Sequence, residues 1–511
     1  MTFGAIKRVA VIGAGASGII AAKAFLEEKS FTEIKVFERN GYVGGLWNYS
    51  SDVDAEIQVP STNPHKSFQP SLKDHEEKPF WPSPAYDSLI TNVPGYLMMY
   101  TPLSPKEDRP FFIHRSDVVD YIVSYAKDIE DLIEFNTNVV DVHKRDGEWV
   151  VSFQKYEGTA PGPIETETFD AIAVAPGYFN IPFTPEVKGM KEFNTQFPGR
   201  ITHAKTFRRA DEFKDKIVLV VGNAASGTDI ANQLVHVTGK KVYKSARSES
   251  TAPGRPYGEI IDVGVIEEFR PDGSILVAGG TVLDDVDAVI YATGYLRSLP
   301  FMSDLNKTDK PLITNGIYVH HLYLHFIYIP DPTIVILGTP RFVLPFRVSQ
   351  AQACYIARVW SGRLKLPPTP IMENFVSRRF KAVGDSYQFH DLAAPLEDAD
   401  FCDWISELCR LAPGDYGMFP RPWPIEEREA RKNIGKLRIA FAEYYDEHGV
   451  YPSSIEQIRL ALKDELEPVD TDPNFESFGK VIRGDEYSQE DILQAEQELA
   501  ETNASSGNKF D

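Results

Sequence analysis

The sequence predicts an α/β fold with two Rossmann-like domains, one inserted into the other, and a helical C-terminal region. Two observations support this prediction. A strand, a glycine-rich turn and a helix occur in that order at residues 9–28 and again at 217–237. A buried strand ending in a small-residue turn occurs at 170–178 and again at 287–295, and the interval between the copies is about one domain long. We therefore expect a first domain in two parts, 1–180 and 296–485, an inserted domain at 181–295, and a tail at 486–511 that starts as a frayed helix and ends disordered.

The bulk composition excludes several classes of protein. The 511 residues carry a net charge of −21, which would repel the phosphate backbone of nucleic acids. Only three cysteines occur, none at CxxC spacing, so we expect a reducing, cytoplasmic location, no metal site and no redox disulfide. We find neither a signal peptide nor an apolar run long enough to span a membrane. Peripheral membrane contact stays open, and a homodimer is compatible with the sequence.

The first glycine turn has the features of a diphosphate-binding turn. Gly13 permits the tight turn, Gly15 lets the backbone approach a diphosphate, and Gly18 lets helix and strand pack closely. The residues between them, Ala16 and Ser17, would open the helix and offer backbone N–H groups. Glu38 ends the next strand, about 20 residues after Gly18, where an acidic side chain accepts hydrogen bonds from a ribose. An acidic residue there disfavours a 2′-phosphate, so this unit predicts FAD or NAD rather than NADP.

Two features after this unit have more than one interpretation. The turn that contains Gly45, Leu46 and Trp47 either lays its backbone against the dinucleotide or is a glycine-rich turn with a core tryptophan. Residues 50–84 form a long irregular excursion, and long loops in compact domains are usually functional or mobile. Thr91 and Asn92 follow it. On composition alone Asn92 is best explained by turn chemistry, through a side-chain bond to its own backbone.

The second unit predicts a different nucleotide. Its turn consists of Gly222, Asn223, Ala224, Ala225, Ser226 and Gly227. Ala224 replaces the middle glycine and adds a methyl group where a diphosphate would pass. The following strand leads to Ser245 and Arg247, and Arg247 lies about 20 residues after Gly227. An arginine there accommodates a 2′-phosphate, so this unit predicts NADPH; the alternative is a solvated surface arginine.

The lack of a CxxC motif separates this chain from the disulfide reductases, which share the plan of one flavin unit and one nested nicotinamide unit. Electrons that reach the flavin must leave by another route, and oxygen is the obvious acceptor.

A stretch between the two units resembles a known fingerprint. Phe197-x-Gly199-x-x-x-His203-x-x-x-Phe207-Arg208 matches the pattern FxGxxxHxxx(Y/F)(K/R) of the flavin-containing monooxygenases. It departs from the related Baeyer–Villiger fingerprint, in which Trp-Pro or Trp-Asp would stand at Phe207-Arg208. The segments GAGASG, GGLW, YDSLITN, GNAASG, YATGY and Pro345-Phe346 with Gln350 are similar to the same family in the same order, from about residue 8 to 363. Beyond 365 the chain looks most like the fungal members.

The resemblance implies an enzyme in which NADPH reduces FAD, and oxygen then adds at flavin C4a to give a hydroperoxide. Retained NADP⁺ would protect this adduct until a soft nucleophile, an amine nitrogen or a sulfur of a small molecule, takes one oxygen atom. The position of Asn92 would lie beside the flavin and NADP⁺, which favours a catalytic role over turn chemistry. Further cofactor contacts are expected from Val140, Thr293, Gly294 and Gln350.

Three other parts of the chain have expected structural roles. Ser349 is expected to cap a helix that faces the flavin, and the stretches between Glu373 and Val481, including 427–449, should be packing helices. We expect His203 and Phe207 to set the relative position of the two lobes.

Two rival functions remain. One is Baeyer–Villiger oxygenation of ketones by the same intermediate, and the other is an uncoupled flavoprotein that acts as an NADPH oxidase or a binding module.

Overall fold

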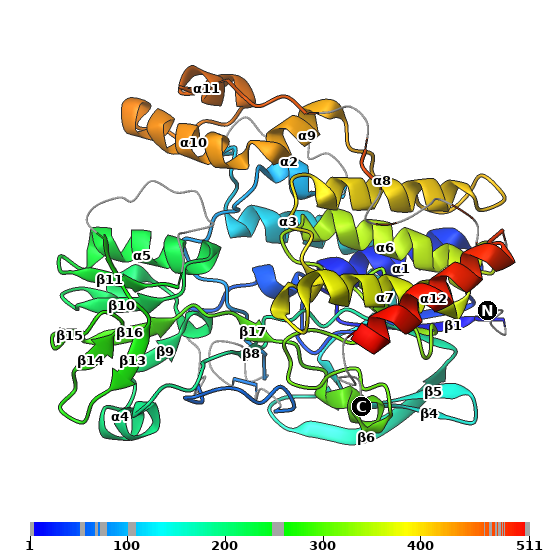
Figure 1. Cartoon of the computed structure of the whole chain (residues 1–511), viewed down its shortest axis with the longest axis horizontal. Coiled ribbons are helices and arrows are strands. Elements are labelled where there is room, and N and C mark those ends of the chain that lie inside the picture. Colours follow the sequence, from blue (N-terminus) through cyan, green and yellow to red (C-terminus); the bar gives the residue numbers. More distant parts are fainter. Residues whose placement is uncertain are drawn as a thin grey trace.

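The computed structural model describes residues 5–505, except 52–56, 67–69, 72–78, 101–108, 248–259 and several positions between 464 and 485. Each of its two lobes contains a mainly parallel sheet, and Figure 1 shows the smaller lobe on the left and the larger on the right. The expected α/β fold with two Rossmann-like domains and a helical C-terminal region is confirmed.

The sheet of the larger lobe is built around β1, which is buried because parallel strands need cover on both faces. β1 pairs in parallel with β2 on one side and β7 on the other, with Val9 opposite Ile34 and Ala171. The order of its seven strands is β18 (Leu322–Tyr323), β19 (Ile327–Tyr328), β20 (Ile334–Ile336), β7 (Ala171–Val174), β1 (Arg8–Ile12), β2 (Glu33–Phe37) and β3 (Ile133–Glu134).

The sheet of the smaller lobe repeats this arrangement around β10. β10 pairs in parallel with β11 and β16, with Leu219 opposite Tyr243 and Val289. The order of its five strands is β12 (Ile260–Val263), β11 (Val242–Ser245), β10 (Val218–Val221), β16 (Ala288–Tyr291) and β9 (Ile201–His203). All five lie between β7 and β20 in the sequence, so the second sheet is inserted between two neighbouring strands of the first.

Three smaller sheets complete the β structure. The lobes are joined by the antiparallel pair β8 (Ile181–Pro182) and β17 (Tyr295–Leu296), which lies between them in Figure 1. One antiparallel sheet, in the larger lobe, has β4 (Thr137–Arg145), β5 (Glu148–Tyr156) and β6 (Pro161–Phe169). The other, in the smaller lobe, has β13 (Ile266–Phe269), β14 (Ile275–Val277) and β15 (Thr281–Leu283).

The helices provide the cover that these sheets need. Those that carry the argument below are α1 (Ala16–Glu28), α3 (Arg115–Ala126), α5 (Ala225–Val237), α6 (Pro345–Trp360), α7 (Thr369–Val383) and α12 (Gln489–Ser505). The others are α2 (Gly95–Met98), α4 (Met190–Gln196), α8 (Glu397–Arg410), α9 (Ile425–Lys432), α10 (Ile434–His448) and α11 (Ile455–Leu460).

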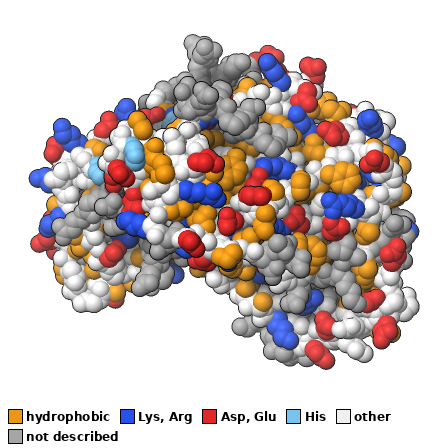
Figure 2. All heavy atoms as spheres, turned by 90° about the horizontal axis from the view of Figure 1, so that it is seen from above, with side chains coloured by type: hydrophobic (Ala, Val, Ile, Leu, Met, Phe, Trp, Pro, Cys, Tyr) orange, Lys and Arg blue, Asp and Glu red, His pale blue; other side chains and the backbone are white. Residues whose placement is uncertain are grey.

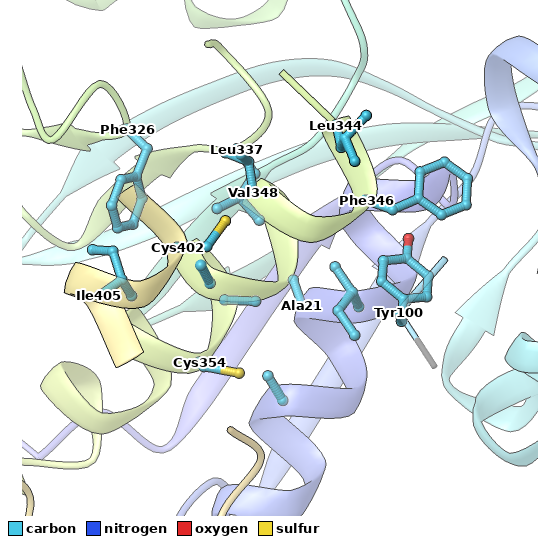
Figure 3. Close-up of a cluster of buried hydrophobic side chains, with 14 of the residues drawn as sticks. Ala21, Tyr100, Phe326, Leu337, Leu344, Phe346, Val348, Cys354, Cys402 and Ile405 are labelled. Atoms are coloured by element: carbon cyan, nitrogen blue, oxygen red, sulfur yellow. The ribbon is translucent and has the colours of Figure 1, made fainter. Parts of the chain in front are cut away.

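The largest core lies around α6, which packs against α1 on one side and α8 on the other (Figure 3). Tyr100 stacks on Phe346 with ring centroids 5.0 Å apart. Cys354 and Cys402 are fully enclosed in this core, and burial raises the pKa of both thiols. Both cysteines are therefore packing residues of the core.

Three sequence-based expectations about helices differ from the structure. The frayed helix expected at the start of the tail is the ordered helix α12 at 489–505, which packs on α7; Ala495 is buried and the Asn374 amide donates to Glu498. Residues 427–449 do not form one helix, because Asn433 interrupts it between α9 and α10. Ser349 does not cap α6, which begins at Pro345, where proline needs no N–H partner.

The surface carries acidic and basic side chains side by side, and the outline of the molecule is indented between the two lobes (Figure 2). Among the helices of the described residues, none has both the length and the apolar character needed to cross a bilayer.

Candidate functional site

The first glycine turn joins the end of β1 to α1, and the space next to Gly15 is open. Gly13 has φ +103°, and a Cβ there would lie 2.4 Å from the carbonyl oxygen of Ala175. A Cβ on Gly18 would lie 1.8 Å from the carbonyl oxygen of Gly13, so both positions need glycine for packing. A Cβ on Gly15 would meet only the Cα of Gly45, at 3.7 Å. No side chain caps α1, so the N–H groups of Ala16 and Ser17 are placed to bind an anion.

Glu38 lies directly behind this turn, at the end of β2. One carboxylate oxygen accepts the N–H of Ala14 at 2.7 Å, and the other accepts the N–H of Asn40 at 2.9 Å. The side chain is buried, and this burial raises its pKa. A carboxylate has about four acceptor positions, so two bonds leave capacity for ribose hydroxyls.

The turn with Gly45, Leu46 and Trp47 is a short 3₁₀ helix that contacts the first turn. The N–H of Gly44 donates to the carbonyl oxygen of Ala14 at 3.1 Å. A Cβ on Gly45 would lie 3.0 Å from the Cα of Gly15. Trp47 is half-buried against the main core. The two interpretations of this turn are therefore compatible: its backbone borders the dinucleotide turn while its tryptophan packs.

Val140 lies in a β-bulge near Glu38. The ladder between β4 and β5 pairs Val139 with Phe153 and Asp141 with Ser152, and it skips Val140. The strand begins beside Glu38, since the N–H of Thr137 donates to the Glu38 carbonyl oxygen at 2.8 Å. Because a bulged residue is left out of the ladder, the backbone N–H and C=O of Val140 can bind a ligand.

Thr91 and Asn92 lie at the end of the segment 83–92, which hydrogen bonds hold in place. The Thr91 hydroxyl accepts the N–H of Ile113 at 3.0 Å, and the Thr91 N–H donates to the Ile113 carbonyl at 2.8 Å. Thr91 is buried, whereas Asn92 is exposed. Within the described residues, the Asn92 amide makes no hydrogen bond to the turn that follows. Its exposed amide is thus available to a ligand.

The second glycine turn repeats the packing of the first. Gly222 has φ +122°, and a Cβ there would lie 2.5 Å from the carbonyl oxygen of Ala292. A Cβ on Gly227 would lie 2.3 Å from the carbonyl oxygen of Gly222. Ala224 is the N-cap of α5, without a side-chain cap, and its methyl group is exposed. The rest of the predicted set, Asn223, Ala225 and Ser226, lies in this turn and in the first residues of α5.

Ser245 and Arg247 follow β11 beside this turn. The N–H of Gly222 donates to the Ser245 carbonyl at 3.0 Å, while the Ser245 hydroxyl donates to Gly264 at 2.9 Å. Arg247 is exposed, as a residue that binds a ligand phosphate must be in the free protein. Nearby Lys244 pairs with Asp262 at 3.3 Å.

Thr293 and Gly294 form the corner where the chain leaves the second sheet. The Thr293 hydroxyl donates to the Phe183 carbonyl at 2.5 Å. The Gly294 carbonyl accepts the N–H of Phe183 at 2.9 Å and lies 3.1 Å from His203 Nε2. This corner is therefore part of the joint between the lobes.

His203 is a structural member of this joint. Its Nδ1 accepts the N–H of Lys205 at 3.0 Å, so its Nε2 carries the proton donated to Gly294. Burial lowers the pKa of His203 to about 3, and the ring is neutral near pH 7. A buried neutral ring with both nitrogens bonded to backbone cannot serve as a general base.

Ser349, rather than Gln350, is the α6 residue that contacts the first turn. Its hydroxyl lies 2.8 Å from the hydroxyl of Ser17. The Gln350 amide oxygen instead accepts the N–H of Arg421 at 3.0 Å, and its nitrogen lies 3.9 Å from the sulfur of Met418. Neighbouring residues of a helix point in directions about 100° apart, so these two side chains have different partners.

Two further residues were not identified from the sequence. Tyr86 is buried, Asp229 is half-buried, and the two are hydrogen-bonded to each other from distant parts of the sequence. An aspartate next to the buried Ile230 of a helix was the available signal, because carboxylates that are partly removed from solvent usually have a partner.

All three cysteines, Cys354, Cys402 and Cys409, are buried and free. Among the described residues, no group of His, Cys, Asp and Glu side chains is arranged to hold a metal ion.

The two lobes thus define a protein with two dinucleotide-type turns, each at the carboxyl end of a parallel sheet. The chain belongs to the flavin-binding monooxygenase-like family, whose model matches residues 6–59, 73–259 and 256–413. It is therefore an oxidoreductase of the monooxygenase type in a flavin-binding family.

Individual relatives agree with this assignment. A flavin-containing monooxygenase of Aspergillus flavus is 28% identical over 460 residues, covering 78% of this chain and 92% of the relative. The thiol-specific monooxygenase of Saccharomyces cerevisiae is 28% identical over 393 residues, covering 72% and 80%. The structure of S-allyl-L-cysteine S-oxygenase from Allium sativum superposes with a TM-score of 0.68 at 25% identity, covering 89% and 97%.

Proposed function

We propose that this chain is an NADPH- and O2-dependent flavin monooxygenase that transfers one oxygen atom to a soft nucleophile of a small molecule, an amine nitrogen or a sulfur. The observation that carries the proposal is the pairing of two dinucleotide turns in one chain with three cysteines that are all single and buried. Electrons delivered to the first site have no dithiol to pass to. We propose that these electrons pass to O2, which reacts with reduced flavins.

FAD fits the first turn and NADPH the second. At the first turn, the space in front of Gly15 admits a diphosphate, the start of α1 offers N–H groups, and Glu38 offers acceptors to a ribose but none of the positive charge that a 2′-phosphate needs. At the second turn, the exposed Arg247 supplies that charge. A bound flavin, once reduced by NADPH, supplies the electrons that activate oxygen.

Asn92 is the residue we assign to the reaction. Its amide carries both a donor and an acceptor, is exposed, and stands at the end of a segment that Thr91 fixes to Ile113. In this role the amide would hydrogen-bond reacting oxygen atoms and keep water from them. No general base is required for transfer to a nucleophile that already has a lone pair.

Sulfur compounds are the first substrates to test. Two relatives are named for sulfur chemistry, a thiol-specific monooxygenase and an S-oxygenase of S-allyl-L-cysteine. Tertiary amines form the second group, because their nitrogen is a soft nucleophile of the same kind.

The test is a product balance with purified protein loaded with FAD. NADPH oxidation, H2O2 release and oxygenated product are measured together for cysteamine, S-allyl-L-cysteine, N,N-dimethylaniline and cyclohexanone. We expect sulfoxide, disulfide or N-oxide to account for most of the NADPH consumed with at least one of the first three. Lactone from cyclohexanone would identify a Baeyer–Villiger enzyme instead. Release of all the NADPH equivalents as H2O2 with every compound would identify an uncoupled oxidase.

Asn92→Ala separates the two halves of the reaction. We expect the product per NADPH to fall at least about tenfold, since the loss of one hydrogen-bond donor in an active site can cost about 100- to 1000-fold in rate, while flavin reduction by NADPH stays within about twofold. Asn194→Ala, on α4 of the smaller lobe, is the matched control and should leave the product balance unchanged. An unchanged balance in Asn92→Ala would remove this residue from the reaction.

A further inference from the structure

The segment 83–92, which ends at Asn92, is attached to the smaller lobe by Arg208. This buried guanidinium donates from Nη1 to the carbonyl of Ala85 at 3.2 Å and from Nη2 to that of Ser83 at 3.0 Å. The N–H of Asp87 donates back to the Arg208 carbonyl at 3.0 Å. Arg208 ends the fingerprint stretch, so this stretch holds the segment as well as joining the lobes.

A second attachment leads directly to the second dinucleotide turn. The Tyr86 hydroxyl donates a short hydrogen bond to Asp229 Oδ2, and the Gln233 amide donates to the same oxygen at 2.9 Å. Asp229 belongs to the beginning of α5, the helix whose N-terminus forms the second turn. The Ser88 hydroxyl also donates to Gln233, at 2.6 Å.

The larger lobe holds the other side of the same segment. His114 Nε2 lies 2.8 Å from the carbonyl oxygen of Asp87, and Arg115 Nε donates to the carbonyls of Tyr86 and Asp87, each at 3.1 Å. Thr91 is fixed to Ile113 by the pair of bonds described above. The few residues between Tyr86 and Asn92 therefore have little freedom, and a shift at Asp229 would reach Asn92.

The ring and the hydroxyl of Tyr86 contact different residues. The ring packs edge-on against Phe207 with centroids 5.5 Å apart. Only the hydroxyl reaches Asp229, and removal from solvent raises the pKa of both groups. Losing one partner of a hydrogen bond that is shielded from solvent costs free energy, so this contact favours one placement of Tyr86 against α5.

We propose that Tyr86 and Asp229 are positioning residues that couple occupancy of the second dinucleotide site to the placement of Asn92. Neither touches the reacting atoms. When NADP⁺ binds to the start of α5, this contact holds the Asn92 segment in its working position, and without it the link between the segment and α5 is reduced to the bond between Ser88 and Gln233. The inference rests on the proposed function for the meaning of Asn92, but its central test does not depend on product formation.

Hydrogen–deuterium exchange on the FAD-loaded protein, with and without NADP⁺, tests the coupling. In the unmodified chain we expect NADP⁺ to slow exchange at 222–237 and also at 85–93. Tyr86→Phe keeps the ring and removes only the hydroxyl, so NADP⁺ should still protect 222–237 but no longer 85–93. Asp229→Asn should behave in the same way and serves if Tyr86→Phe does not fold. Protection of 85–93 that persists in both variants, or that is missing from the unmodified chain, would overturn the proposal.

A matched control and a catalytic readout complete the design. Tyr243→Phe removes another tyrosine–aspartate contact of the same lobe, at 3.4 Å from Asp285, and should leave protection at 85–93 intact. In Tyr86→Phe the fraction of NADPH lost as H2O2 should rise several-fold while flavin reduction stays within about twofold, and the double variant with Asp229→Asn should be no worse than either single one. Full product yield without exchange coupling would refute this inference alone, and exchange coupling without any oxygenated product would refute the proposed function alone.

Discussion

The imidazole of His203 lies 3.1 Å from the carbonyl oxygen of Gly294, and this contact joins the end of β9 to the corner where the chain returns to the larger lobe. Tyr295 packs edge-on against the same ring with centroids 5.1 Å apart. His203, the histidine of the fingerprint, is thus part of the joint between the lobes, and its contacts give it no role as a catalytic base.

The protonation of His203 gives a pH-dependent stability. Its pKa is lowered to about 3 in the folded protein against 6.5 for the free side chain. The folded state therefore binds fewer protons, and the contribution of the neutral ring is present above pH 6.5 and is lost as the pH falls from 6.5 towards 3. By linkage this amounts to about 2 kcal/mol between pH 7 and pH 5.

His203→Gln tests that loss. Between pH 7 and pH 5, the free energy of unfolding of the variant should fall by about 2 kcal/mol less than that of the unmodified chain, measured by urea denaturation. His65→Gln replaces an exposed histidine and should follow the unmodified chain. Equal acid sensitivity of His203→Gln and the unmodified chain would show that the ring does not resist protonation.

Two glycines of the first turn should respond differently to alanine. A Cβ at Gly15 meets nothing closer than 3.7 Å, so Gly15→Ala should fold normally but lose FAD, because its methyl group occupies the space of the diphosphate. A Cβ at Gly18 would lie 1.8 Å from a backbone oxygen, so Gly18→Ala should lose about 3 kcal/mol of folding stability. Flavin absorbance per chain and the melting temperature of the apoprotein measure the two effects. FAD retained at full occupancy in Gly15→Ala would contradict the assignment of this turn.

Arg247→Ala should erode the preference for NADPH over NADH by about ten- to a hundred-fold, since a charge-assisted bond contributes about 1.5–3 kcal/mol. Lys244→Ala is the control, because Lys244 already pairs with Asp262 at 3.3 Å. The measurement is the ratio of kcat/KM for the two nucleotides. Arg208 cannot substitute, since its Nη atoms donate to backbone carbonyls. A loss of preference in Lys244→Ala alone would move the phosphate site to that residue.

Ala224→Gly should strengthen binding at the second turn. The Ala224 methyl group is exposed at the N-cap of α5, where a diphosphate would approach, and glycine is acceptable at an N-cap. We expect KM for NADPH to fall several-fold with kcat little changed. A higher KM would mean that the methyl group contacts the ligand favourably.

Local sequence was enough to predict the two strand–turn–helix units. The turn at Gly13 and the turn at Gly222 each need glycine for a contact with a neighbouring strand end, and such requirements leave a clear spacing in the sequence. Glu38 and Arg247 follow the second strand of their units, where the ribose of a bound dinucleotide would lie, and this position also leaves a clear spacing in the sequence.

Contacts between distant segments could not be predicted in this way. Tyr86 and Asp229 are far apart in the sequence, and nothing in either local sequence identifies the other as its partner. Ser349 and Gln350 are adjacent, and only the rotation of α6 decides which contacts the first turn. The helix at 489–505 is ordered because it packs on α7, and the composition of the segment does not reveal this partner.

The insertion of the smaller sheet between β7 and β20 has a consequence for synthesis on the ribosome. The strands that flank the inserted part are neighbours in one sheet, with Ile172 opposite Ile334, yet the second emerges only after the whole smaller lobe has been made. The smaller lobe has all its strands between residues 201 and 291 and can fold as a unit while the larger sheet still lacks an edge. Until β20 has been synthesised, β7 of the nascent larger lobe is unpaired on one side. Because an unpaired strand edge can pair with other chains, we expect chaperones to be needed most during that interval.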